Sequence, residues 1–129
     1  MFTLEQIKQA HSKVKSGADF PKYIQEIKIL GVTAFETRVK DSCTEYFGTH
    51  GYRTSSIPMY EDLIIAAVCD KERFEHCLKI HQHGKTDYFE FCRDCAATGV
   101  EKWVVNLDEM TCIYYNLAGN NVLMERIPQ

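Results

Sequence analysis

The apolar positions of the first thirty residues recur with the spacing of two helices. From 4 to 14 and again from 20 to 27 they return every three or four residues, which gives each segment one apolar face. Gly17 is expected to end the first helix, because glycine adopts the left-handed conformation that closes many helices. Asp19 is expected to cap the second helix and Gly31 to end it. The chain therefore opens with a predicted helical hairpin.

The next segments alternate with a period of two, which is typical of strands buried on one face. Residues 33–39, 43–47 and 52–57 predict three strands, and a turn at 48–51 joins the last two. Pro58 is expected to end the third strand, because proline lacks the backbone N–H that a sheet uses.

An apolar run at 60–69 fits either a buried strand or the start of a long helix, and its β-branched content and length favour a strand. Asp70 is then expected to cap a third helix that Gly84 ends. A fourth helix is expected to begin at Thr86 or Asp87 and to end at Gly99. The remaining apolar segments predict a three-stranded meander at 102–107, 111–116 and 122–127.

The two halves of the chain share one order of predicted elements: helix, helix, strand, strand, strand. An offset of 68 residues aligns Gly31 with Gly99 and Phe35 with Trp103. We therefore predict an internal duplication within a two-layer α+β fold, whose antiparallel sheet is covered by helices on one side. A continuous sheet with inserted helices and no internal symmetry is the alternative. The predicted structural repeats are residues 1–58 and 70–128, joined by 59–69.

Composition narrows the class of protein. The 129 residues are 45% hydrophobic and 26% charged, which fits one folded domain over 1–129 with a single core. The net charge of −3 argues against nucleic-acid binding, which needs clustered Lys and Arg. We expect a cytoplasmic protein without membrane contact, because we find no secretion signal and no apolar run near the roughly 20 residues that span a bilayer. The six cysteines then predict reduced thiols.

One cysteine motif could hold a metal. Cys92 and Cys95 form a C-x-x-C, with histidines nearby at 76, 81 and 83, so a zinc site or a redox pair is one interpretation. The motif lies one to two turns inside its predicted helix, however, and continues the apolar stripe of Tyr88 and Phe91. We therefore expect buried structural thiols and predict no metal or cofactor, with a zinc protein as an alternative.

Polar and aromatic residues near the middle of the second half are the candidate binding residues. They are His81, Gln82, His83, Trp103 and Tyr114. His81 to His83 could form the polar rim of a pocket, while the aromatic pair could cover a partner; the alternative is that these rings belong to a sheet face packed under helices.

Three acidic residues, Glu36, Asp41 and Glu45, could suggest paired carboxylates, but acids spread over two strands are more typical of a solvated face. No catalytic residue is predicted, since no acid, base and nucleophile converge.

Several short patterns carry a resemblance to a known family. They are His81-Gln82-x-Gly84, Asp87-Tyr88, Phe91-Cys92, Gly99-Val100, Trp103, Met110-Thr111-Cys112, Tyr114 and Glu125-x-Ile127-Pro128. With a looser likeness around Gly31 and Tyr46-Phe47-Gly48, the chain resembles an uncharacterised group of small bacterial and prophage proteins known as phage envelope proteins. The resemblance implies a phage or prophage link and brings no activity and no catalytic residues.

The sequence as a whole favours a non-enzymatic binding or interaction protein. The closing strand at 122–127 carries only two charges, Glu125 and Arg126, and an unprotected strand edge favours pairing. We therefore expect a homodimer. The alternative function is a small-molecule-binding protein or enzyme with a site near His81, Gln82, Trp103 and Tyr114.

Overall fold

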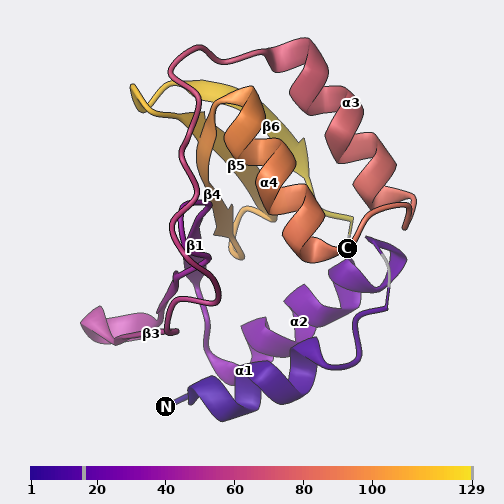
Figure 1. The fold of residues 1–129 in the computed structure, drawn as a ribbon. Coiled ribbons are helices and arrows are strands. Elements are labelled where there is room, and N and C mark those ends of the chain that lie inside the picture. The colour runs from indigo at the N-terminus through magenta and orange to yellow at the C-terminus, as the bar shows by residue number, and fades with distance from the viewer. Residues whose placement is uncertain (16, 129) are drawn as a thin grey trace.

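Helices cover one face of an antiparallel sheet in the computed structural model (Figure 1). The structure describes residues 1–15 and 17–128. Short 3-10 turns lie at Gly17–Asp19 and Thr49–Gly51. The other elements of the described residues are α1 (Leu4–His11), α2 (Phe20–Leu30), β1 (Ala34–Arg38), β2 (Thr44–Phe47), β3 (Arg53–Ser55), α3 (Lys71–Gln82), α4 (Tyr88–Thr98), β4 (Val100–Asn106), β5 (Thr111–Asn116) and β6 (Asn121–Arg126).

The ends of the helices follow from local side chains. Asp70 and Asp87 cap α3 and α4 by accepting hydrogen bonds from backbone N–H groups of the first turn. Gly31 and Gly99 end α2 and α4 in the left-handed conformation. The expected end of the first helix at Gly17 is wrong, because α1 already ends at His11.

The sheet joins two meanders through its central strands. The order is β3-β2-β1-β4-β5-β6, and every neighbouring pair is antiparallel. At the centre Glu36 of β1 lies opposite Val104 of β4. The register inside the two meanders corresponds at the predicted offset, since Phe35 pairs with Tyr46 and Trp103 with Tyr114. The α+β fold class predicted from the sequence is therefore confirmed.

One face of this sheet forms the core. Phe35, Val105 and Tyr114 point towards the helices and are buried, as alternation along each strand requires. In Figure 1 the hairpin α1–α2 lies beside the β1–β3 half and α3–α4 beside the β4–β6 half, on the same side of the sheet. Ile24 and Ile27 of α2 are fully buried in the same core.

The segment between the two halves differs from its prediction. Residues 60–69 form neither strand nor helix, because their backbone bonds are made to loops and helix ends. Leu63 N donates to Lys40 O, Ala66 N to Ala96 O and Asp70 N to Thr98 O, each at 2.8 Å. We call residues 56–70 the connector. The strand before it is also shorter than expected, with three residues in β3.

Gly99 tests how tightly the connector packs. Its φ is +88°, and a Cβ there would lie 2.7 Å from Cys69 Cα and 2.8 Å from Val68 O, which are backbone atoms that cannot rotate away. Gly119 has a similar φ of +82° with nothing within 4 Å of such a Cβ. Gly119→Ala is therefore expected to lower the unfolding free energy by about 1 kcal/mol. Gly99→Ala should cost roughly 1–3 kcal/mol more. Urea denaturation measures the unfolding free energy of both variants. Equal losses would show that the connector backbone shifts to make room for the added Cβ.

Candidate functional site

The candidate aromatic and histidine residues meet in one cluster under α3 and α4. His81 stacks on Phe91 with ring centroids 4.4 Å apart and an interplanar angle of 10°. Phe91 lies 5.8 Å from Trp103, and Trp103 lies 6.2 Å from its cross-strand neighbour Tyr114. Phe74 of α3 closes the group at 5.0 Å from Tyr114. The sequence thus identified residues that the fold does bring together.

This cluster is a packed core layer. Phe74, Phe91 and Tyr114 are 0%, 4% and 6% exposed, and Trp103 is half-buried. Burial raises the pKa of Tyr114 well above its ordinary value, so this phenol stays neutral. Trp103 and Tyr114 lie on the face that the helices cover, as one of the two interpretations of the sequence expected. The alternative, an aromatic patch that covers a partner, stays a prediction for the half-buried Trp103 and is not favoured by the buried Tyr114.

His81 is held as a neutral ring. Its Nδ1 lies 3.1 Å from both the carbonyl oxygen and the hydroxyl oxygen of Thr86, so Nδ1 either donates to the carbonyl or accepts from the hydroxyl. Burial lowers the pKa of His81, because the stacked and half-buried ring loses water as a cation. Among the described residues, both hydrogen-bond partners of the ring are therefore on Thr86, and one of them is a hydroxyl; no carboxyl group of these residues is hydrogen-bonded to the ring.

Gln82 and His83 lie apart from the rings. The Gln82 amide donates to both carboxylate oxygens of Glu125 in β6, at 3.1 and 3.3 Å. His83 is the exposed residue that follows α3. The five predicted residues therefore divide into a packed group of His81, Trp103 and Tyr114, of which Tyr114 alone is buried, and two exposed residues, Gln82 and His83.

Two residues outside the five candidates connect the halves of the molecule. The hydroxyls of Ser42 and Tyr88 are hydrogen-bonded at 2.6 Å, and the Tyr88 ring lies edge-on to Trp103 at 6.3 Å. Ser42 is buried in the β1–β2 turn with a φ of +62°. Nothing in the sequence indicates this contact, because serine in a turn usually bonds its own backbone.

The cysteine motif lies inside the core. Cys92 and Cys95 are both fully buried, and burial raises the pKa of each thiol, which makes them poor nucleophiles and poor metal ligands. His76 is exposed on the neighbouring helix. Across residues 1–15 and 17–128, no three His, Cys, Asp or Glu side chains are grouped in a way that could hold a metal ion.

The three acidic residues are not one site. Glu36 and Glu45 face each other across β1 and β2 on the face of the sheet without helices, each with its own cation. Lys102 lies 2.9 Å from Glu36, and Arg53 lies 3.2 Å from Glu45. Asp41 is buried at the turn and accepts from the Cys43 backbone N–H, so its expected place on a solvated face is wrong.

The hollows of the surface lie elsewhere. The larger measures about 360 Å³ and runs along α3 and α4; the smaller, about 150 Å³, lies on the open face of the sheet. Neither is lined by any of the five predicted residues. The linings are Arg73, Glu90, Arg93, Asp94 and Ala97 for the larger, and Glu36, Arg38, Cys43, Thr44, Glu45 and Ser55 for the smaller.

These features define a two-layer α+β protein whose candidate residues are mostly built into the layer between helices and sheet. No curated protein matches this sequence. The sequence model of DUF1398, described as a protein of unknown function, matches residues 8–126, and the chain belongs to this family. The match confirms the predicted domain of unknown function, and its description names no activity. No helix within the described part of the chain is both long and apolar enough to cross a membrane.

His81 predicts a pH dependence of stability. Its folded pKa lies below the ordinary value of 6.5, so below about pH 7 the unfolded chain binds the proton more readily, and the unfolding free energy should fall as the pH falls. His11, whose pKa burial also lowers, adds to this slope. Urea denaturation between pH 7.5 and 5.5 measures how the unfolding free energy changes with pH. This change should be smaller for His81→Gln than for the wild type. The exposed His83→Gln serves as control. Equal slopes for all three proteins would contradict the neutral, buried ring.

Proposed function

We propose that this protein works by binding other macromolecules and not by catalysis. The observation that carries the proposal is the closed packing around His81: the ring stacks on Phe91, and Trp103 and Tyr114 fill the space behind it. On that side of the half-buried ring, an opening would require these aromatic rings to move. The alternative of a small-molecule site at His81, Gln82, Trp103 and Tyr114 needs such an opening.

A broad screen of hydrolase and transferase substrates tests the absence of catalysis. No turnover above a buffer control is expected. A turnover that is lost in both His81→Gln and Tyr114→Phe, with the circular dichroism spectrum unchanged, would show that the cluster opens and would overturn the proposal.

The proposed binding includes self-association through β6. This strand is an edge of the sheet, with β5 on one side only. Ile127 N donates to Met110 O, so by alternation the backbone groups of Glu125 face β5 while those of Met124 and Arg126 face outward. The other edge strand, β3, has three residues and is followed by Pro58, which blunts it.

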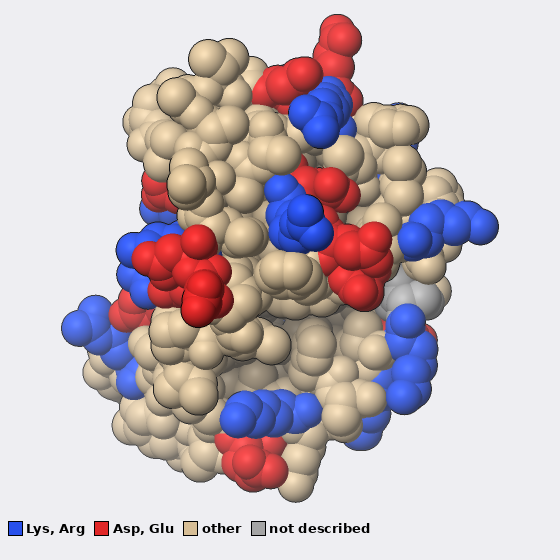
Figure 2. Space-filling view, viewed as in Figure 1, with Lys and Arg blue, Asp and Glu red and all other residues tan. Residues whose placement is uncertain are grey.

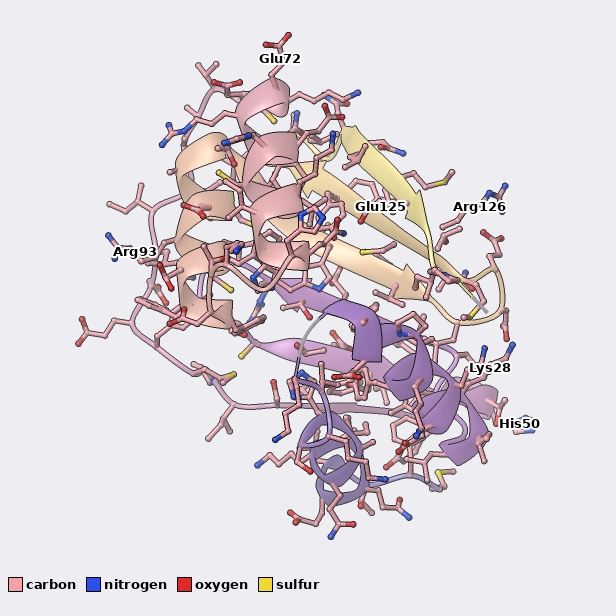
Figure 3. The ribbon with its side chains drawn as sticks, turned by 90° about the vertical axis from the view of Figure 1, so that its right-hand side faces the viewer. Lys28, His50, Glu72, Arg93, Glu125 and Arg126 are labelled. Carbon is pink, nitrogen blue, oxygen red and sulfur yellow. The ribbon has the colours of Figure 1, made fainter. Side chains whose placement is uncertain are left out.

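The two charges of β6 do not protect its edge. Gln82 holds the Glu125 carboxylate on the helix side of the sheet, and Figure 3 shows Arg126 pointing away from the helices. Met124, which precedes both, is 47% exposed. A six-residue edge strand without a lysine, with Pro128 only beyond its end, favours antiparallel pairing with a second copy.

A proline variant tests the outward backbone hydrogen bonds of β6 without disturbing its pairing with β5. Because the Met124 N–H faces outward, Met124→Pro removes a donor of the proposed interface and no hydrogen bond to β5. Light scattering at micromolar concentration should show a dimer for the wild type and for Met124→Ala, and a monomer for Met124→Pro. A monomeric wild type would contradict self-association.

The proposal also includes an internal duplication, a phage or prophage context and a location in the cytoplasm. The repeated register, Phe35 with Tyr46 and Trp103 with Tyr114, supports descent of the two halves from one duplicated unit. The resemblance to phage-related proteins supports a phage or prophage context, and the six free thiols support a location in the cytoplasm.

A further inference from the structure

The connector exposes an unusual number of large apolar side chains. Ile57, Met59, Ile64 and Val68 are 77%, 67%, 92% and 82% exposed. Leu63 and Ile65, between them, pack against the core. Single exposed apolar residues need no explanation, but four within twelve residues of one segment make it a candidate binding surface, which we call the patch.

The backbone of this segment is fixed although it has no regular secondary structure. Met59 N donates to Asp41 O, and Ala66 N donates to Ala96 O of α4. The Tyr60 hydroxyl donates to Val39 O. Such a backbone presents its side chains in a preformed arrangement, which lowers the entropy cost of binding.

The patch continues onto the beginning of α4. The Phe89 ring, 44% exposed, lies 5.1 Å from the Tyr60 ring. The Arg93 guanidinium lies 6.0 Å above Phe89, and Figure 3 shows this side chain pointing outward. In Figure 1 the connector runs past the sheet beside α4, the helix that carries Phe89.

The charges along the connector have one sign. From Thr54 to Asp70 the chain has no lysine or arginine and has three acids, Glu61, Asp62 and Asp70. Asp62 pairs with Lys40 at 3.4 Å, with 65% of its side chain exposed. Figure 2 shows, on this face, acidic side chains in small groups beside basic ones, separated by uncharged surface. The middle of the patch is therefore acidic and its two ends are apolar.

We propose that the connector, with Phe89, is the docking surface for a segment of a partner protein in which apolar side chains flank a lysine or arginine. The apolar side chains would cover Ile57, Met59, Ile64 and Val68, and the cation would lie against Glu61 and Asp62. This inference rests on the proposed binding function and is independent of the dimer through β6.

The same charges disfavour two other occupants. A second copy packed symmetrically on this patch would bring its own Glu61 and Asp62 against the first pair, and like charges repel at close range. An anionic lipid surface would meet the same acids. A basic partner segment is complementary to the acids and to the apolar ends.

A library of random twelve-residue peptides displayed on phage provides the test. Peptides are selected on the immobilised wild-type chain and then measured in solution against four proteins. The double variant Ile64→Ser, Val68→Ser removes the apolar end, and Glu61→Lys reverses the charge; both change exposed residues. Ile29→Ser, at a residue of α2 that is 86% exposed, is the matched control.

The selected peptides should combine apolar residues with a central lysine or arginine. Their affinity should fall at least tenfold for the double variant and at least threefold for Glu61→Lys, and should be unchanged for Ile29→Ser. Peptides that bind the double variant as well as the wild type, acidic peptides, or no enrichment would overturn the proposal.

Two added measurements identify another occupant. A dimer that the double variant abolishes and Met124→Pro does not would mean that a second copy covers the patch. Binding to phosphatidylserine vesicles that the double variant abolishes would mean a membrane surface. Either result would overturn the proposal that a basic partner segment docks here. An enzymatic turnover, in contrast, would contradict the proposed function and leave the peptide results in place.

Discussion

The pairing of β1 with β4 is the interaction on which the rest of the structure depends. Each meander alone is three strands with one apolar face, and only this pair makes them one six-stranded sheet. Phe35 then lies opposite Val105 and Thr37 opposite Trp103, so the two hairpins of helices cover one continuous layer. Without that pair each half would leave a central strand edge open and too little apolar area buried.

The sequence predicted the elements that local chemistry determines. Asp70 and Asp87 as helix caps, Gly31 and Gly99 as helix ends, and 111–116 as a strand agree with the structure because each depends on a few neighbouring residues. Residues 60–69 could not be assigned correctly, since a β-branched apolar run carries the same pattern whether it pairs in a sheet or lies along loops and helix ends. Their hydrogen bonds to Lys40 and Ala96 are tertiary.

The sequence indicated which residues come together in the candidate site, but not whether they are open to solvent. The sequence suggested a site near His81, Gln82, Trp103 and Tyr114, and the structure joins the three rings through Phe91 while Gln82 bonds Glu125. Whether such a group is a pocket or a core depends on how closely α3 and α4 approach the sheet, and a single sequence does not contain that distance. The contact of Ser42 with Tyr88 joins residues 46 positions apart, for which periodicity gives no signal.

The central strand pair also bears on how the chain folds. Glu36 and Val104 meet across most of the sequence, and closing so long a loop costs conformational entropy that the hairpins β1–β2 and β4–β5 do not incur. Topologies dominated by such distant contacts fold slowly. During synthesis the N-terminal half emerges first, and β1 then has no neighbour on the side that β4 later occupies. The nascent chain carries an unsatisfied strand edge until about residue 106 has left the ribosome, which is the interval in which it is most exposed to aggregation.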